Sequence, residues 1–111
     1  MTHNLSLETF RQVEMRVGTI LSAEIFEAAK KPAYKIVVDF GEFGTLKTSA
    51  QITKLYKPAD LTGRQIVAVV NFAPKQIANM MSECLILGAV NGDEVTLLTP
   101  ERPVANGTRI G

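Results

Sequence analysis

Apolar residues recur at every second position in several short segments of the chain, the pattern of half-buried β-strands. Residues 13–20 alternate in this way, and Gly18 within them predicts a bulge or a bend. Turn residues separate this segment from similar ones, which predict strands over residues 33–40, 45–52, 64–72, 83–90 and 94–99. Five or six short strands of this kind indicate an all-β fold, a small Greek-key barrel.

Short helices and tight turns complete the predicted fold. Ser6 is an N-cap residue ahead of a short helix over residues 7–10. Residues 53–61 predict a short helix or an irregular crossing that Pro58 interrupts. Asn91-Gly92 is a strong hairpin signal, and we expect the tail from Pro100 onward to fold back over the rest. The chain shows neither a repeat nor a boundary, so we expect residues 1–111 to form one domain.

The connector between the two most apolar predicted strands has an unusual composition. Surface connectors are usually polar, whereas this one mixes apolar side chains, two of them methionines, with hydrogen-bonding groups. These residues are Asn71, Phe72, Pro74, Lys75, Gln76, Ile77, Met80 and Met81. Such a mixture suits a binding groove that repacks around varied partners, or an interface between two copies of the chain. A third interpretation is that the connector only caps the core.

Composition and charge narrow the functional classes. The 111 residues are 46% hydrophobic and 21% charged, as in ordinary globular proteins. A net charge of +1 is too low for binding dominated by phosphate neutralisation, so any RNA site must be local. Cys84 is the single cysteine, which excludes an internal disulfide, and its apolar neighbours predict an inert buried thiol. No secretory signal and no run of about 20 apolar residues is found, so we expect a cytoplasmic protein.

The residues needed for catalysis are not grouped in the sequence. His3 is the only histidine and lies in a terminal segment, which argues against a Ser-His-Asp arrangement. No glycine-rich phosphate loop is present. The carboxylates fall at predicted strand ends and turns, where solvated acids are expected. We therefore predict a binding protein that is not an enzyme, with no cofactor and no metal site.

Several blocks of the sequence resemble those of a known family. They are Val13-x-x-Arg16-Val17-Gly18-Thr19-Ile20, Lys31-Pro32-Ala33-Tyr34-Lys35, Ser49-Ala50-Gln51-Ile52, Gly63-Arg64-Gln65, Val69-Val70-Asn71-Phe72-x-Pro74-Lys75-Gln76-Ile77, Met81-Ser82-Glu83-Cys84-Leu85-Ile86-Leu87 and Pro103-x-x-Asn106-Gly107. Together they span almost the whole chain, which resembles the tRNA-binding OB-fold family. The second, fifth and sixth blocks are specific to its CsaA branch of export-related chaperones.

This resemblance implies a five-stranded OB barrel with short flanking helices that works as a homodimer. Members of the branch are associated with chaperone activity, with binding of exported precursor proteins and with the Sec translocation motor. Other relatives bind tRNA in a shape-dependent, sequence-tolerant manner. Of the family's RNA-contacting positions, Lys35, Asn71 and Ser82 match, whereas Cys84-Leu85 stands where the family has Gly-Met. That difference removes one typical RNA-site residue.

Two ligand hypotheses follow from the residues and the resemblance together. In the first, non-native or precursor polypeptides bind the connector described above. In the second, tRNA binds a local site on the face of the second and third strands, formed by Lys31, Lys35, Asn71 and Ser82. Further candidates for this face are the basic Lys30, Lys47, Lys54, Lys57 and Lys75, with Tyr34 and Phe43 as stacking surfaces. For any one lysine, the alternative is a solvated strand face that prevents edge-to-edge pairing.

Overall fold

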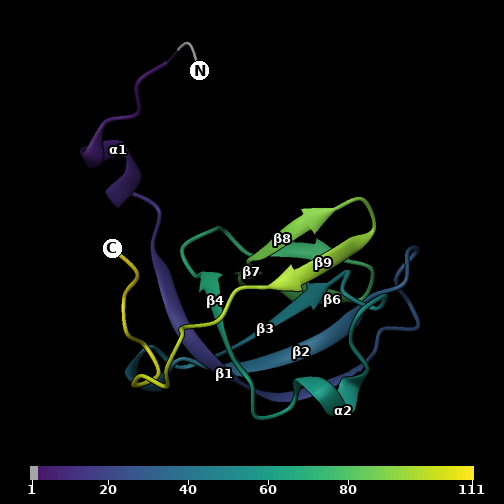
Figure 1. Ribbon diagram of the computed structural model, residues 1–111. Helices are drawn as coiled ribbons and strands as arrows, with labels where there is room; N and C mark the ends of the chain where they lie inside the picture. The colour runs from purple at the N-terminus through teal and green to yellow at the C-terminus, as the bar shows by residue number, and fades with distance from the viewer. Residues whose placement is uncertain (1–2) are drawn as a thin grey trace.

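A computed structural model describes residues 3–111 and shows a curled antiparallel sheet (Figure 1). Its strands run in the order β3-β2-β1-β4-β7. Their bounds are β1 Met15–Ile25, β2 Tyr34–Asp39, β3 Thr45–Ala50, β4 Gln65–Val69 and β7 Leu85–Ile86. The sheet nearly closes into a barrel, because the backbone N–H of Glu83 donates to the Lys47 carbonyl (2.8 Å) on the far edge strand β3. The predicted all-β barrel is confirmed.

Strand β2 shows most clearly how the sequence builds this sheet. Its residues are alternately buried and half-buried, so Ile36 and Val38 face the interior while Lys35 and Val37 face outward. The hairpin of β2 and β3 keeps a regular register from Tyr34 opposite Ala50 to Asp39 opposite Thr45, as the alternation predicts. A short 3₁₀ helix, η1 (Gly41–Phe43), joins the two strands.

The irregularity in β1 lies elsewhere than predicted. The register of β1 against β2 shifts between Ile20 and Ser22. Gly18 itself pairs with Ile66 of β4 in a regular register, so of the predicted bulge or bend at Gly18 the bulge is wrong. Gly18 is required for another reason. A Cβ atom at this position would lie 2.6 Å from Val38 Cγ1 and 2.8 Å from the Phe40 ring. The missing side chain therefore allows β1 to pack closely against β2.

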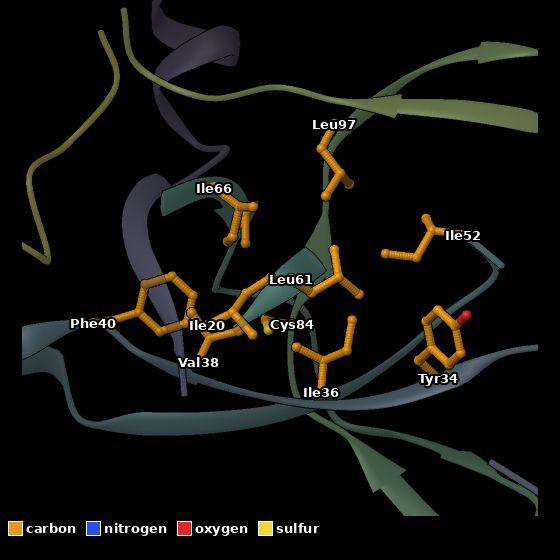
Figure 2. Close-up of a cluster of buried hydrophobic side chains, with 11 residues drawn as sticks. Ile20, Tyr34, Ile36, Val38, Phe40, Ile52, Leu61, Ile66, Cys84 and Leu97 are labelled. Atoms are coloured by element: carbon orange, nitrogen blue, oxygen red, sulfur yellow. The ribbon is translucent and has the colours of Figure 1, made fainter. Parts of the chain in front are cut away.

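The interior of the barrel is filled by branched aliphatic and aromatic side chains (Figure 2). Those that are almost completely buried include Ile20, Ile36, Val38, Phe40, Leu61 and Ile66. Among the described residues Thr48 is the one buried polar side chain, and its Oγ1 donates to the Cys84 carbonyl oxygen at 2.6 Å. Since this bond joins β3 to the segment before β7, it holds the barrel seam from inside.

Four further elements lie around the barrel. They are α1 (Leu7–Arg11), α2 (Pro58–Leu61), β8 (Gly88–Asn91) and β9 (Glu94–Leu97). The predicted N-cap is confirmed, because the Thr9 N–H donates to Ser6 Oγ at 3.0 Å. Pro58 begins α2 where we predicted an interruption, since proline fits the first helical position. The predicted strand over residues 83–90 is divided into β7 and β8, and the Asn91-Gly92 hairpin is confirmed.

The apolar connector after β4 forms a hairpin of its own. Strands β5 (Lys75–Ile77) and β6 (Met80–Ser82) pair in a separate two-stranded sheet. These two strands were not predicted, because the sequence pattern indicated only a connector here. At the tip Ala78 has a φ of +51°, in the left-handed region that favours glycine. Beneath the hairpin Met80 packs with Phe26 and Ala33 in a small cluster separate from the barrel core.

The C-terminal tail folds back along β1, as predicted. The Gly107 N–H donates to the Val17 carbonyl at 2.7 Å, and the Ile110 N–H donates to the Met15 carbonyl at 2.9 Å. Helix α1 stands away from the barrel, with the C-terminal end on the same side (Figure 1). Arg109 connects the two, because its Nη2 donates to the Arg11 carbonyl at 2.8 Å.

Candidate ligand-binding face

The outer face of β2 and β3 carries the residues that alternation turns away from the core. Lys35 and Val37 come from β2, and Lys47 and Ser49 come from β3. The β1–β2 loop and the β5–β6 hairpin border this face. Glu83 fixes the hairpin's base, because its Oε1 accepts the Lys47 N–H at 3.0 Å. Two clefts lie on either side of the hairpin.

The first cleft has a volume of about 430 Å³ and is bordered by β6. Its lining residues are Ser22, Glu24, Lys35, Ile36, Val37, Lys47, Asn79, Met80 and Met81. Met81 is 41% exposed and supplies an apolar wall. Ammonium, hydroxyl and amide groups surround that wall. The first cleft can therefore accept an apolar side chain and hydrogen-bond the polar groups next to it.

The second cleft has a volume of about 490 Å³ and is bordered by β5. Its lining residues are Ala28, Ala29, Lys30, Lys31, Ala33, Ser49, Gln51, Gln76, Ile77 and Ala78. Small side chains make up much of the wall, and two lysines belong to the same lining. This arrangement leaves room for an extended backbone, with amide side chains nearby as hydrogen-bond partners.

The predicted polypeptide-binding residues separate into three groups. Met81 in the first cleft and Gln76 and Ile77 in the second lie where a ligand can reach them. Met80 is 8% exposed, because its side chain packs beneath the hairpin. The third group lies outside both clefts and comprises Asn71, Phe72, Pro74 and Lys75. Phe72 is 58% exposed but lines neither cleft.

Asn71 already has partners within the chain. Its Oδ1 accepts the Glu14 N–H at 3.0 Å, and its Nδ2 donates to the Gln12 carbonyl at 2.7 Å. The side chain thus holds the segment that joins α1 to β1. These two hydrogen bonds give the asparagine after β4 a structural role that requires neither a polypeptide nor a tRNA ligand.

The residues predicted to bind tRNA are also distributed unevenly. Lys31 lines the second cleft and Lys35 the first. The Nζ atom of Lys35 lies 3.9 Å from Glu24 Oε1 and 5.3 Å from the centroid of the Phe26 ring. Ser82 is half-buried, and its Oγ accepts the Ser49 N–H at 3.3 Å. Ser82 therefore joins β6 to β3, and the two lysines are the predicted residues open to a ligand.

Neither aromatic ring predicted to stack on bases has both faces accessible to a ligand. Tyr34 is 6% exposed and its hydroxyl donates to the Tyr56 carbonyl at 2.7 Å, so the prediction of a stacking role is wrong. Its position at an inward-facing site of β2 is the physical reason. Phe43 is exposed, but the guanidinium of Arg16 lies 3.6 Å from its ring centroid and covers one face.

Chemical reactivity is low at Cys84. Burial raises the pKa of its thiol to about 12, as expected for a thiol inside an apolar core. Across residues 3–111 no group of three or more His, Cys, Asp or Glu side chains is arranged to hold a metal ion. No helix in the same residues is long and apolar enough to cross a membrane.

Sequence reasoning missed Val37 and Asn79 in the first cleft. The alternation of β2 was a sufficient signal for Val37, because it turns this residue outward next to Lys35. Asn79 had no comparable signal, since it lies at the tip of a hairpin that was not predicted.

Comparison with known proteins identifies the family. The family described as "Putative tRNA binding domain" matches residues 15–109, and the chain therefore belongs to it. A crystal structure of the chaperone CsaA from Bacillus anthracis superposes with a TM-score of 0.94 at 47% sequence identity. It covers 98% of this chain and 100% of that one. The CsaA chaperone protein of Picrophilus torridus gives a TM-score of 0.91 at 46% identity, with coverage of 97% and 100%. The resemblance to the CsaA branch and the OB-type barrel are confirmed.

A second kind of relative is a much larger protein. The methionine–tRNA ligase of Methanoculleus marisnigri is 39% identical over 106 residues, which are 96% of this chain. The chain spans only 15% of that ligase's length. The likeness therefore concerns one part of the ligase.

Proposed function

We propose that this protein is a chaperone without catalytic activity that binds non-native or precursor polypeptides on the face of β2 and β3. The observation that supports it is the first cleft, where exposed Met81 lies among hydrogen-bonding side chains. An unfolded segment offers both apolar side chains and an unpaired backbone. The cleft provides groups for each, and a methionine adapts to side chains of different shape.

The expected affinity is modest. Full burial of a client side chain of Leu or Phe size contributes about 1.5–3 kcal/mol before ordering costs. Two such side chains, one in each cleft, would give dissociation constants of about tens of micromolar or weaker. A weak, reversible complex is suited to a chaperone that must release its client.

The protein is proposed to act as a homodimer through α1. No residue of this five-residue helix is buried, and Leu7 is 60% exposed. A helix this short is not stable by itself in water. Leu7, Phe10 and Val13 line a cleft of about 420 Å³ together with the C-terminal Ile110. A second copy that covers these side chains would stabilise α1 and place two binding faces in one particle, which raises avidity for a long client.

The dimer can be tested by sedimentation equilibrium on Leu7→Glu. A carboxylate in the α1 cleft should shift the protein from dimer to monomer at micromolar concentration. Leu55→Glu is the matched control, because Leu55 is also an exposed leucine and lies outside this cleft. A wild-type monomer, or a Leu7→Glu protein that remains dimeric, would refute this interface.

The cellular role proposed is Sec-dependent protein export, in the cytoplasm and together with the Sec translocation motor. It rests on the likeness to proteins described as the chaperone CsaA. The test is a pull-down of purified Sec motor protein, with and without a precursor, by the immobilised chain. Failure of the immobilised chain to retain the Sec motor protein, both with and without the precursor, would contradict this role.

Polypeptide binding itself is tested by fluorescence anisotropy with a labelled unfolded precursor peptide. Met81→Ala should weaken the complex about fivefold, as expected from loss of part of one apolar contact. Leu98→Ala is the matched control, since Leu98 has similar exposure and lines neither cleft. Equal affinities for Met81→Ala and the wild type would refute the first cleft as the site.

A second candidate function is structure-specific, sequence-tolerant tRNA binding. It is favoured by the family match and by Lys31, Lys35 and Lys47, which stand at the two clefts. Binding by these lysines should weaken steeply with salt. For each phosphate contact, log K should fall by about 0.7–0.9 for a tenfold rise in salt concentration. A Lys35→Ala, Lys47→Ala double variant should weaken tRNA binding, and unchanged affinity would exclude this face.

A further inference from the structure

Four clefts adjoin one another around the β1–β2 loop and share lining residues. The first cleft shares Glu24 and Lys35 with a neighbouring cleft at the base of the loop. That neighbour meets the second cleft at Ala28. The second cleft in turn shares Lys31 and Gln51 with an end cleft of about 550 Å³ beside the β8–β9 hairpin. We call these four clefts together the lysine groove.

The lysine groove carries more positive charge than the chain as a whole suggests. Its lining contains five lysines, which are Lys30, Lys31, Lys35, Lys47 and Lys54. Spaced lysines along a groove form the electrostatic footprint expected for a nucleic-acid backbone. The same lining contains three carboxylates, which are Glu24, Glu27 and Asp93. Five cations and three anions leave a balance of +2.

Two of these carboxylates are paired with lysines of the groove. Glu24 Oε1 lies 3.9 Å from Lys35 Nζ at one end, and Asp93 Oδ2 lies 3.6 Å from Lys54 Nζ at the other. A phosphate that approaches either lysine must displace its carboxylate and is repelled by it. An uncharged polypeptide segment does not compete with the carboxylates for the lysines and is not repelled by them.

We propose that Glu24 and Asp93 set the ligand preference of the lysine groove, by occupying Lys35 and Lys54 and thereby weakening the binding of RNA relative to polypeptide. This inference deepens the proposed function, since it assumes that both ligand classes meet the same face. Both ion pairs are solvent-exposed, so each carboxylate changes RNA affinity a few-fold and not by orders of magnitude. Salt reduces the effect, because exposed charges are screened.

The experiment is a salt titration of fluorescent tRNA binding to Glu24→Gln, Asp93→Asn and the double variant. Each single variant should bind tRNA about two- to fivefold more tightly than the wild type at low salt. The double variant should gain about tenfold, with a salt slope steeper by about 0.7–0.9 for each lysine released. Glu42→Gln is the matched control, because it makes the same change in net charge on η1, outside the groove.

A second set of variants isolates the pairing. Adding Lys54→Ala to Asp93→Asn should abolish the gain in affinity, since the released ammonium group is then absent. Gains no larger than that of Glu42→Gln would overturn the proposal, as would a gain that survives Lys54→Ala. An unfolded peptide is measured in parallel. A wild-type protein that binds no peptide would refute the polypeptide function, whereas a gain in tRNA affinity would still support the weakening of RNA binding by the two carboxylates.

Discussion

The barrel core and the small cluster beneath the β5–β6 hairpin differ in how they are built. The core joins side chains from several strands and α2, and Ile20, Ile36 and Leu61 are completely buried. The small cluster has three buried side chains, two of them Phe26 and Met80, from a loop and a hairpin. Regions with few apolar contacts open at low free-energy cost. The elements that border the proposed binding face are therefore expected to move while the barrel stays closed.

The largest expected effect comes from breaking the core. Ile36→Ala removes buried methyl groups at the barrel centre and should lower the free energy of unfolding by about 2–5 kcal/mol in denaturant titrations. Val37→Ala, one position along β2, should cost less than about 1 kcal/mol because Val37 faces the first cleft. Similar losses for the two variants would contradict the assigned alternation of β2.

Met80→Ala should break the small cluster and leave the barrel folded. The expected cost is about 2 kcal/mol, at the low end for a buried methionine because the cluster is small. Hydrogen exchange is the informative measurement, with faster exchange expected for the β5–β6 amides and little change in β1 and β2. Met80→Leu keeps the volume and should restore slow exchange. Uniformly faster exchange would mean that hairpin and barrel unfold as one unit.

Met81→Ala should leave stability almost unchanged. The neighbouring methionine faces the first cleft and is exposed, so thermal unfolding should shift by no more than about 0.5 kcal/mol in free energy. A loss comparable to that of Met80→Ala would show that both methionines support the hairpin, and would remove the distinction between the packed and the available side chain.

The smallest effect near neutral pH belongs to Cys84. Its folded pKa is raised by burial from 9.0 to about 12. The neutral thiol therefore favours the folded state fully below pH 9, and this contribution is lost as pH rises toward 12. Relative to Cys84→Ala, wild-type stability should be constant between pH 6 and 8 and fall above pH 9. Rapid alkylation of the folded protein at pH 8 would contradict the assigned burial.

Sequence patterns predicted the barrel better than the binding face. Alternation over β2 and β3 predicted that hairpin, because one face of each strand is buried and fixes the register. The β5–β6 hairpin escaped prediction because its strands have three residues each and its tip has Ala78 where glycine is expected. The stacking role predicted for Tyr34 failed because the same alternation turns its ring inward.

At the candidate site, residue type predicted which chemical groups are present but not whether their side chains are free to contact a ligand. Asn71 and Ser82 are polar residues in a promising segment, yet each is occupied by a backbone partner far away in sequence. Such long-range hydrogen bonds leave no local pattern. Val37 was missed for the opposite reason, since an apolar strand residue is usually assigned to the core.

The pairing of the C-terminal tail with β1 has a consequence for synthesis on the ribosome. Met15 and Val17 are translated early, but their backbone partners at Gly107 and Ile110 are translated at least ninety residues later. Until then, that edge of β1 has no partner from the tail and is open to pairing with other nascent strands. Contacts of such separation also slow folding. A protein proposed to bind unfolded chains therefore exposes an unpaired strand edge of its own while it is being synthesised.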